Sequence, residues 1–147
     1  MRLWHKDLIK VLPRQQLISQ WRECCCIARN INVKGSPKHI LANPIMNYPI
    51  NDFMYYTSLV YREIINRGYR ANFDKFRQHF PLYCPNGFYV FADLYKDWHN
   101  DRYLIQCFYN LQEKFDRGGI SIDEWNKIES FCKERLGYEL YIMNCEG

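Results

Sequence analysis

The feature that most constrains the fold is the apolar periodicity of residues 13–31. Apolar side chains recur there at i, i+4, i+7, i+8 and i+11, namely Leu17, Trp21, Cys24, Cys25 and Ala28. This period places the five side chains along one face of an α-helix. No segment of the chain shows the sustained alternation that is typical of a half-buried strand. We therefore expect an all-α fold, with residues 1–147 forming a single compact domain of three to five helices joined by long loops.

Other segments carry similar helical signals. Helices are also expected over residues 50–67, 72–79 and 91–116. A last helix begins at Ser121, which forms an S-x-x-E capping box with Glu124, and it closes at Gly137. Residues 1–12 are expected to form a short helix or an extended segment. Residues 80–90 contain prolines and an Asn-Gly pair, and these predict a loop.

The net charge of the chain limits which kinds of partner it is expected to bind. The 147 residues carry a formal net charge of +4 and a pI near 8.6. This is mildly basic, and weaker than the strongly basic character of a dedicated DNA-binding domain. Nucleic-acid binding would therefore need a local concentration of cations. Aromatic residues make up 17% of the chain, and exposed Tyr side chains could stack on bases.

The sequence indicates a cytoplasmic protein without metal. The N-terminus alternates apolar and charged residues, and no apolar run approaches the ~18–20 residues of a membrane span. Seven Cys, an odd number without a secretion signal, predict reduced thiols. Cys24, Cys25 and Cys26 are consecutive, and on a helix they point about 100° apart, so they cannot all bind one ion. We expect neither a metal nor any other cofactor.

The N-terminus itself offers a reactive group. Arg2 is bulky, and the enzyme that removes initiator methionine needs a small second residue, so Met1 is expected to be retained. An α-amino group ordinarily has a pKa of roughly 7.7–8.0, far below the ~10.4 of a lysine. A sizeable fraction of such amines is unprotonated and nucleophilic at neutral pH. Together with arginines and the helix residue Glu23, this amine could form an imine-forming active site.

The polar side of the 13–31 helix carries a carboxylate among cations and amides. Gln15, Arg22 and Arg29 are spaced seven apart and lie nearly in line on the helix. Glu23 is the residue after Arg22, and it also lies outside the apolar face of the helix. The loop of residues 34–39 that follows is basic and rich in turn-forming residues.

Two segments resemble a known family. One is Gln15-Gln16-Leu17-Ile18-Ser19-Gln20-Trp21-Arg22-Glu23 with Arg2 beside the terminus, and the other is the helix that runs from Tyr55 into Arg67-Gly68-Tyr69. They resemble the pyrimidine-dimer DNA glycosylases, the endonuclease V type first known from a bacteriophage. The resemblance covers about the first half of the chain. It implies that an N-terminal amine attacks the sugar C1′ of a damaged nucleotide and that a helix glutamate assists.

On this chain the implied catalytic roles fall on the α-amine of Met1 and on Glu23, with Arg2 and Arg22 holding phosphates. The chain departs from the family pattern at three places. The family exposes a small residue at its mature N-terminus, it has a further arginine where this chain has Cys26, and its basic aromatic tail is replaced here by an acidic end. Arg29 could partly replace the missing arginine. The departures leave the preferred lesion open, including another damaged base or a bare abasic site.

The expected partner is damaged double-stranded DNA, bound by a monomer and without a membrane. The residues expected to contact DNA are Arg2, His5, Gln15, Arg22, Arg29, Lys38 and His39. The alternative is a non-enzymatic α-helical domain that binds nucleic acid or protein through exposed Tyr side chains. A metal-dependent nuclease ranks last, because the sequence offers too few clustered acids.

Overall fold

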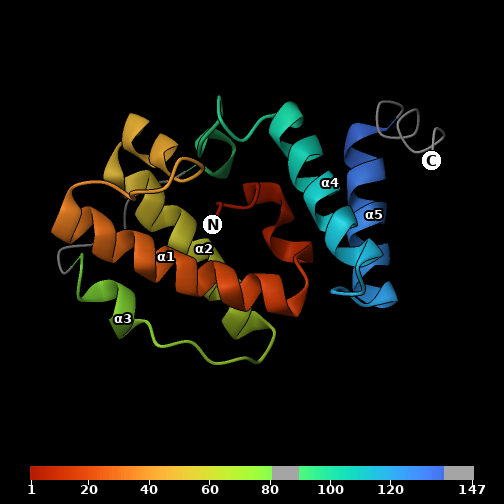
Figure 1. Cartoon of the computed structure of the whole chain (residues 1–147), viewed down its shortest axis with the longest axis horizontal. Coiled ribbons are helices and arrows are strands. Elements are labelled where there is room, and N and C mark those ends of the chain that lie inside the picture. The colour runs from red at the N-terminus through yellow and green to blue at the C-terminus, as the bar shows by residue number, and fades with distance from the viewer. Residues whose placement is uncertain (81–89, 138–147) are drawn as a thin grey trace.

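The computed structural model describes residues 1–80 and 90–137, and these are helical without strands (Figure 1). The α-helices are α1 (Arg14–Lys34), α2 (Ile50–Asn66), α3 (Asp74–Arg77), α4 (Asp101–Asp116) and α5 (Ile122–Leu136). Three 3-10 helices join them, namely η1 (Lys6–Val11), η2 (Asn43–Asn47) and η3 (Phe91–Asp93). The prediction of an all-α fold is confirmed. Most of the loop expected over 80–90, and the acidic tail, lie outside the described residues.

The apolar stripe of α1 forms the central core with α2. Leu17, Cys24 and Ala28 are fully buried and Trp21 nearly so, while Cys25 is half-buried. The facing side chains of α2 are equally buried, and they are Phe53, Tyr56, Val60 and Ile64. Each apolar side chain of this size contributes about 1.5–3 kcal/mol when it leaves water. The pair α1–α2 therefore forms the scaffold on which the other elements rest.

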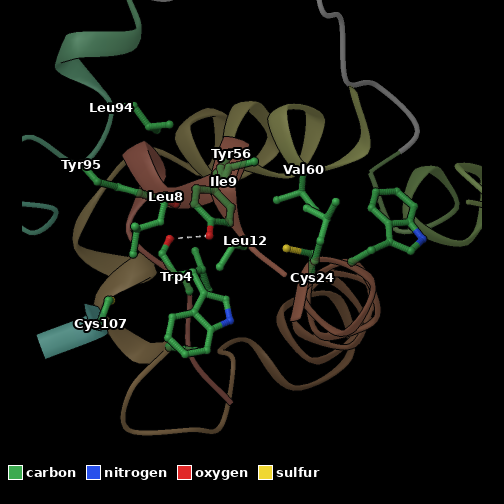
Figure 2. Close-up of a cluster of buried hydrophobic side chains, with 14 of the residues drawn as sticks. Trp4, Leu8, Ile9, Leu12, Cys24, Tyr56, Val60, Leu94, Tyr95 and Cys107 are labelled. Atoms are coloured by element: carbon green, nitrogen blue, oxygen red, sulfur yellow. Dashed lines mark hydrogen bonds between the residues drawn. The ribbon is translucent and has the colours of Figure 1, made fainter. Parts of the chain in front are cut away.

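The first twelve residues run through the interior of the fold. Residues 1–5 belong to no helix or strand and η1 follows them, so the short helix, one of the two forms expected for residues 1–12, occurs over Lys6–Val11. Figure 1 shows this segment between the α1–α2 pair and the α4–α5 pair. Leu3, Leu8 and Leu12 are buried, and the hydroxyl of Tyr56 donates to the Trp4 carbonyl at 2.6 Å (Figure 2). The N-terminal segment is thus held by packing and does not fray.

One carboxylate caps two helices. The Ser121 hydroxyl accepts the backbone N–H of Glu124 at 3.2 Å, and the Glu124 side chain reaches back to Ser121, which confirms the predicted capping box. The same carboxylate accepts the backbone N–H of Arg14 at 2.8 Å, where Pro13 gives α1 no capping side chain of its own. Burial alone would raise the pKa of Glu124, but these N–H and O–H donors outweigh burial and lower it.

The helix expected over 91–116 is wrong at its start. Residues 91–93 form η3, and α4 begins only at Asp101. Asn100 caps α4, since its side-chain oxygen accepts the backbone N–H of Tyr103 at 2.9 Å. Tyr95, with a φ of 50°, takes the left-handed conformation that interrupts a helix, and its fully buried ring packs against Tyr48 and Tyr56. Aromatic packing from distant segments overrides the local helical preference here.

Candidate active site

A buried glutamine fixes the N-terminal segment against α1. The side chain of Gln20 is fully buried. Its oxygen accepts the backbone N–H of Trp4 at 2.7 Å and the hydroxyl of Tyr56 at 3.1 Å, and its nitrogen donates to the carbonyl of Arg2 at 3.0 Å. These bonds hold residues 2–4 alongside α1. Gln20 was not among the predicted site residues, although the sequence contains a signal for its burial, because it precedes Cys24 by four residues and so lies on the buried face of the helix.

Glu23 follows one turn later and lies beside the chain terminus. Its carboxylate is half-buried, with an oxygen 3.4 Å from the side-chain nitrogen of Gln20. Burial raises the pKa of Glu23 above its ordinary value. The terminal ammonium of Met1 and the backbone N–H of Arg2 lower this pKa, in agreement with the Gln20 side-chain nitrogen, which lies within hydrogen-bond distance of both the Arg2 carbonyl and the Glu23 carboxylate. The structure therefore brings together the amine and the glutamate that the sequence singled out.

Two further basic side chains act on the same carboxylate. His39, in the segment after α1, and Lys114, in the last turn of α4, also lower the pKa of Glu23. Lys114 was not expected at this site, and no local pattern marks it, because the fold brings it from a distant helix. The carboxylate thus lies within a positive surrounding supplied by three separate segments. Such a surrounding suits a phosphate-bearing ligand.

The guanidinium of Arg2 is turned towards α4. It lies over the ring of Trp4, 5.6 Å from the centroid, and it acts on Tyr103 and Cys107 of α4. Burial raises the pKa of both of those groups, and Arg2 counteracts this effect. The side chain is half-buried. The backbone of Arg2 therefore lies near Glu23, while its side chain packs beside α4. The expected contact between its guanidinium and a phosphate remains a prediction.

Three other predicted residues lie on the outer face of α1. Gln15, Arg22 and Arg29 are exposed. Gln15 and Arg22 border a surface cavity of about 420 Å³ that extends to Gly119. Glu23 does not line this cavity, since adjacent helical residues point about 100° apart. The structure keeps these three side chains together on one surface but separates Arg22 from the immediate surroundings of Glu23.

The remaining predicted pair, Lys38 and His39, lies in the turn after α1. Lys38 is exposed and adopts a φ of 59°. His39 is half-buried, and its Nδ1 accepts the backbone N–H of Leu41 at 3.2 Å. The influence of His39 on Glu23 places this turn next to the terminus. The basic loop is therefore part of the site, as its sequence suggested.

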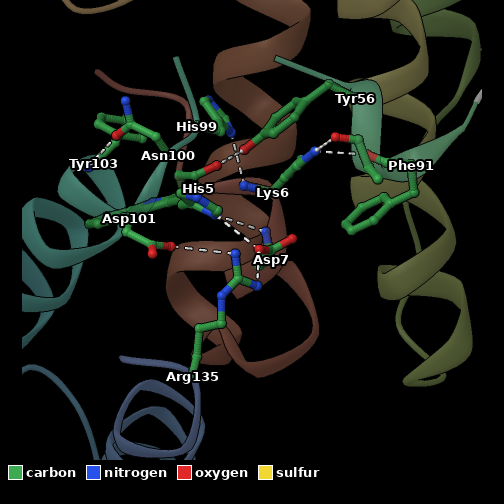
Figure 3. Close-up of polar contacts among 12 residues, drawn as sticks. His5, Lys6, Asp7, Tyr56, Phe91, His99, Asn100, Asp101, Tyr103 and Arg135 are labelled. Atoms are coloured by element: carbon green, nitrogen blue, oxygen red, sulfur yellow. Dashed lines mark hydrogen bonds and ion pairs between the residues drawn. The ribbon is translucent and has the colours of Figure 1, made fainter. Parts of the chain in front are cut away.

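The expectation that His5 contacts DNA is wrong. His5 is fully buried, and its Nδ1 accepts the backbone N–H of Asp7 at 3.1 Å. Its ring lies 5.2 Å from that of His99, which is also buried and accepts the backbone N–H of Lys6 at 2.9 Å (Figure 3). The sequence could not show this burial, because the partners of His5 come from the segment before α4. His5 is a core residue in this fold.

These two histidines should make the fold sensitive to acid. Burial lowers the pKa of His5 and lowers that of His99 well below its ordinary value. Asp7 opposes the shift at His5, whereas Arg135 and Lys6 reinforce it. The unfolded chain then binds more protons than the folded chain once the pH drops below about 6.5, and stability falls by up to about 1.4 kcal/mol per pH unit for each histidine.

We therefore expect urea unfolding to show a stability that declines from pH 7.5 to pH 5.5. His99→Gln keeps an acceptor for the backbone N–H of Lys6 but cannot titrate. The free energy of unfolding of this variant should therefore fall less steeply with decreasing pH, by up to about 1.4 kcal/mol per pH unit, because one proton fewer is taken up on unfolding. A parent stability that is unchanged over this range, or an equally steep decline in the variant, would show that His99 is not responsible.

The cysteines differ in their surroundings. Cys24 is buried, Cys25 half-buried and Cys26 exposed on the polar side of α1. Burial raises the pKa of Cys24, and it raises that of Cys25 to about 11. Over residues 1–80 and 90–137, no three His, Cys, Asp or Glu side chains are grouped so that they could hold a metal ion. In the same ranges, no helix has the length and apolar character needed to cross a bilayer.

Comparison with known proteins gives one match. A family model described as pyrimidine dimer DNA glycosylase matches residues 1–77. This range contains the N-terminal segment and α1 to α3, and therefore Met1, Gln20, Glu23 and the basic turn. No curated protein and no solved structure matches the chain.

Proposed function

The chain belongs to the pyrimidine dimer DNA glycosylase family, whose model matches 77 of its 147 residues, and from this premise we propose that it removes damaged pyrimidines and nicks the strand through an imine on its N-terminal amine. The observation that carries the proposal is that the side-chain nitrogen of Gln20 lies 3.0 Å from the carbonyl oxygen of Arg2 and 3.4 Å from the Glu23 carboxylate, so that Gln20 holds the residue next to Met1 beside Glu23. An amine nucleophile must be positioned before its basicity matters. The buried N-terminal segment supplies that positioning.

The proposed reaction has two stages. The lone pair of the Met1 amine forms a bond to C1′ while the C1′–base bond breaks. The base takes the bonding electrons and a proton, and in a pyrimidine dimer it stays joined to the neighbouring pyrimidine through the cyclobutane ring. The sugar ring then opens and the amine loses a proton, which gives an imine at C1′. The imine acidifies the C2′ proton, and its removal expels the 3′ phosphate by β-elimination. This sequence is covalent amine catalysis and needs no metal.

Glu23 has two tasks in this scheme. Its negative charge stabilises the positive charge that develops on the sugar as the base departs, and the effect is strong because the carboxylate is half-buried. Its pKa is raised by burial, so the carboxyl can exchange protons closer to neutral pH than an ordinary glutamate. The same group can therefore carry the C2′ proton in the second stage.

We propose that exposed cations hold the phosphates on both sides of the lesion. Arg22 and Arg29 offer an outer surface on α1, and Lys38 extends it beside the site. His39 and Lys114 lie near Glu23 and suit the phosphate closest to the reacting sugar. One chain supplies the amine, the carboxylate and these cations, so we propose that a monomer acts on duplex DNA.

The proposal is tested with untagged protein and a duplex that carries one cyclobutane pyrimidine dimer. We expect cleavage of a C1′–base bond and a nick at the dimer, undiminished by EDTA, and no cleavage of undamaged duplex. Binding to the duplex without cleavage of the C1′–base bond or the strand would support the non-enzymatic alternative. Cleavage that EDTA abolishes and magnesium restores would support a metal-dependent hydrolase instead.

A further inference from the structure

Exposed apolar side chains are concentrated in the segment that follows α1. Ile40 is 82% exposed, and Leu41 and Met46 are about half exposed, at 44% and 47%. We call residues 38–46 the apolar turn. A soluble surface usually disperses such side chains, and a group of them marks a place that meets another molecule. Ile40 carries the largest exposed fraction of the large apolar residues in the described part of the chain.

The apolar turn is built to hold these side chains outward. The carbonyl of His39 accepts the backbone N–H groups of Ala42 at 3.0 Å and of Asn43 at 2.8 Å, and the Asn43 side chain accepts the backbone N–H of His39 at 3.2 Å. Ala42 and Ile45 are buried and anchor the turn in the core. Ile40 therefore projects from a fixed backbone, and its exposure is part of the fold.

The position of the apolar turn points to its ligand. In Figure 1 the segment after α1 turns back over the helix towards the end marked N. His39 precedes Ile40 directly, and its effect on the pKa of Glu23 agrees with a place of this segment near the carboxylate. Exposed Lys38 stands on the other side of His39 and can meet a phosphate. An apolar tip close to a cation matches a DNA strand, which has an apolar stack inside a charged backbone.

On the premise of the proposed function, we propose that Ile40 enters the base stack beside the lesion and occupies the space that opens there. An amine can reach C1′ only where the base stack around the lesion is opened, and unstacking is costly. Apolar side chains inserted between base steps offset this cost in proteins that kink DNA. Ile40 would bury on insertion a surface that is exposed in the free protein. Leu41 and Met46 would contact the adjacent sugars.

The test compares two substrates that differ only in stacking. One is a duplex with a central abasic site, and the other is the abasic strand alone, where no stack must be opened. Imine formation is followed by borohydride trapping in untagged parent, Ile40→Ser and Ile40→Leu. We expect Ile40→Ser to slow trapping on the duplex by roughly 10- to 100-fold and to leave the single strand within about twofold of the parent. Ile40→Leu should restore most of the duplex rate.

Val33→Ser is the matched control. Val33 is 68% exposed in the last turn of α1 and lies outside the apolar turn, so its replacement should change neither substrate. A fluorescent adenine analogue next to the abasic site reports unstacking, and Ile40→Ser should weaken its signal on binding. An equal loss on both substrates, or no loss on the duplex, overturns the role of Ile40. Failure of the parent to trap either substrate removes the proposed function itself, and this inference with it.

Discussion

Glu23→Gln is expected to lower base excision by roughly 10²- to 10⁴-fold while leaving affinity for damaged duplex nearly unchanged. The amide preserves the size of the side chain and its place beside Gln20, but it removes the charge and the proton exchange. Strand breakage at the dimer after alkali treatment, which reports cleavage of the C1′–base bond, measures the first effect, and a binding titration with the same duplex measures the second.

A matched control separates this effect from a general loss of charge. Glu129 is a partly exposed glutamate of α5 that pairs with Lys133, and Glu129→Gln should excise at the parent rate. Excision by Glu23→Gln at a rate close to that of the parent would exclude Glu23 as the catalytic carboxylate. A loss of binding as large as the loss of excision would assign Glu23 a structural role instead.

Gln20→Ala is expected to affect both stability and catalysis. The change removes all three hydrogen bonds that join α1 to residues 2–4 and Tyr56, and it leaves the buried N–H of Trp4 and the carbonyl of Arg2 without partners. Each unsatisfied buried group costs about 1–3 kcal/mol, so the free energy of unfolding should fall by about 2–5 kcal/mol. The terminal amine should also lose its fixed position, and imine formation should slow by at least about tenfold.

Urea unfolding and borohydride trapping on an abasic duplex measure these two effects. Gln106→Ala, an exposed glutamine of α4, should behave as the parent. Tyr56→Phe keeps the ring and removes only the hydroxyl, so a smaller loss of about 1 kcal/mol is expected, and it remains informative if Gln20→Ala does not fold. Parent-like stability and trapping in Gln20→Ala would refute the positioning role.

Periodicity and capping allow the helices to be predicted from the sequence where the signal is local. The stripe of α1 and the inner face of α2 are buried as their spacing indicates, and the capping box at Ser121 starts α5. The start of α4 could not be predicted, because it depends on how the rings of Tyr95 and Trp98 pack against other segments. Local signals fix element type, whereas such boundaries depend on tertiary contacts.

The same distinction applies to the candidate site. Met1 and Glu23 could be paired from the sequence because a family pattern relates them. Lys114 could not, since only the fold brings the end of α4 to Glu23. His5 looked accessible because it is polar and near the terminus, yet His99 and Tyr103 stack against it in the interior. Burial of a polar side chain depends on partners that are distant in the sequence.

The most direct test of the account is the identity of the nitrogen that forms the imine. Untagged protein is incubated with a duplex containing an abasic site, reduced with borohydride and digested, and the peptide that carries the sugar is sequenced by mass spectrometry. The account predicts that the adduct lies on the α-amine of Met1. An adduct on the side chain of Lys38 or Lys114, or no adduct under conditions in which the strand is nicked, would contradict it.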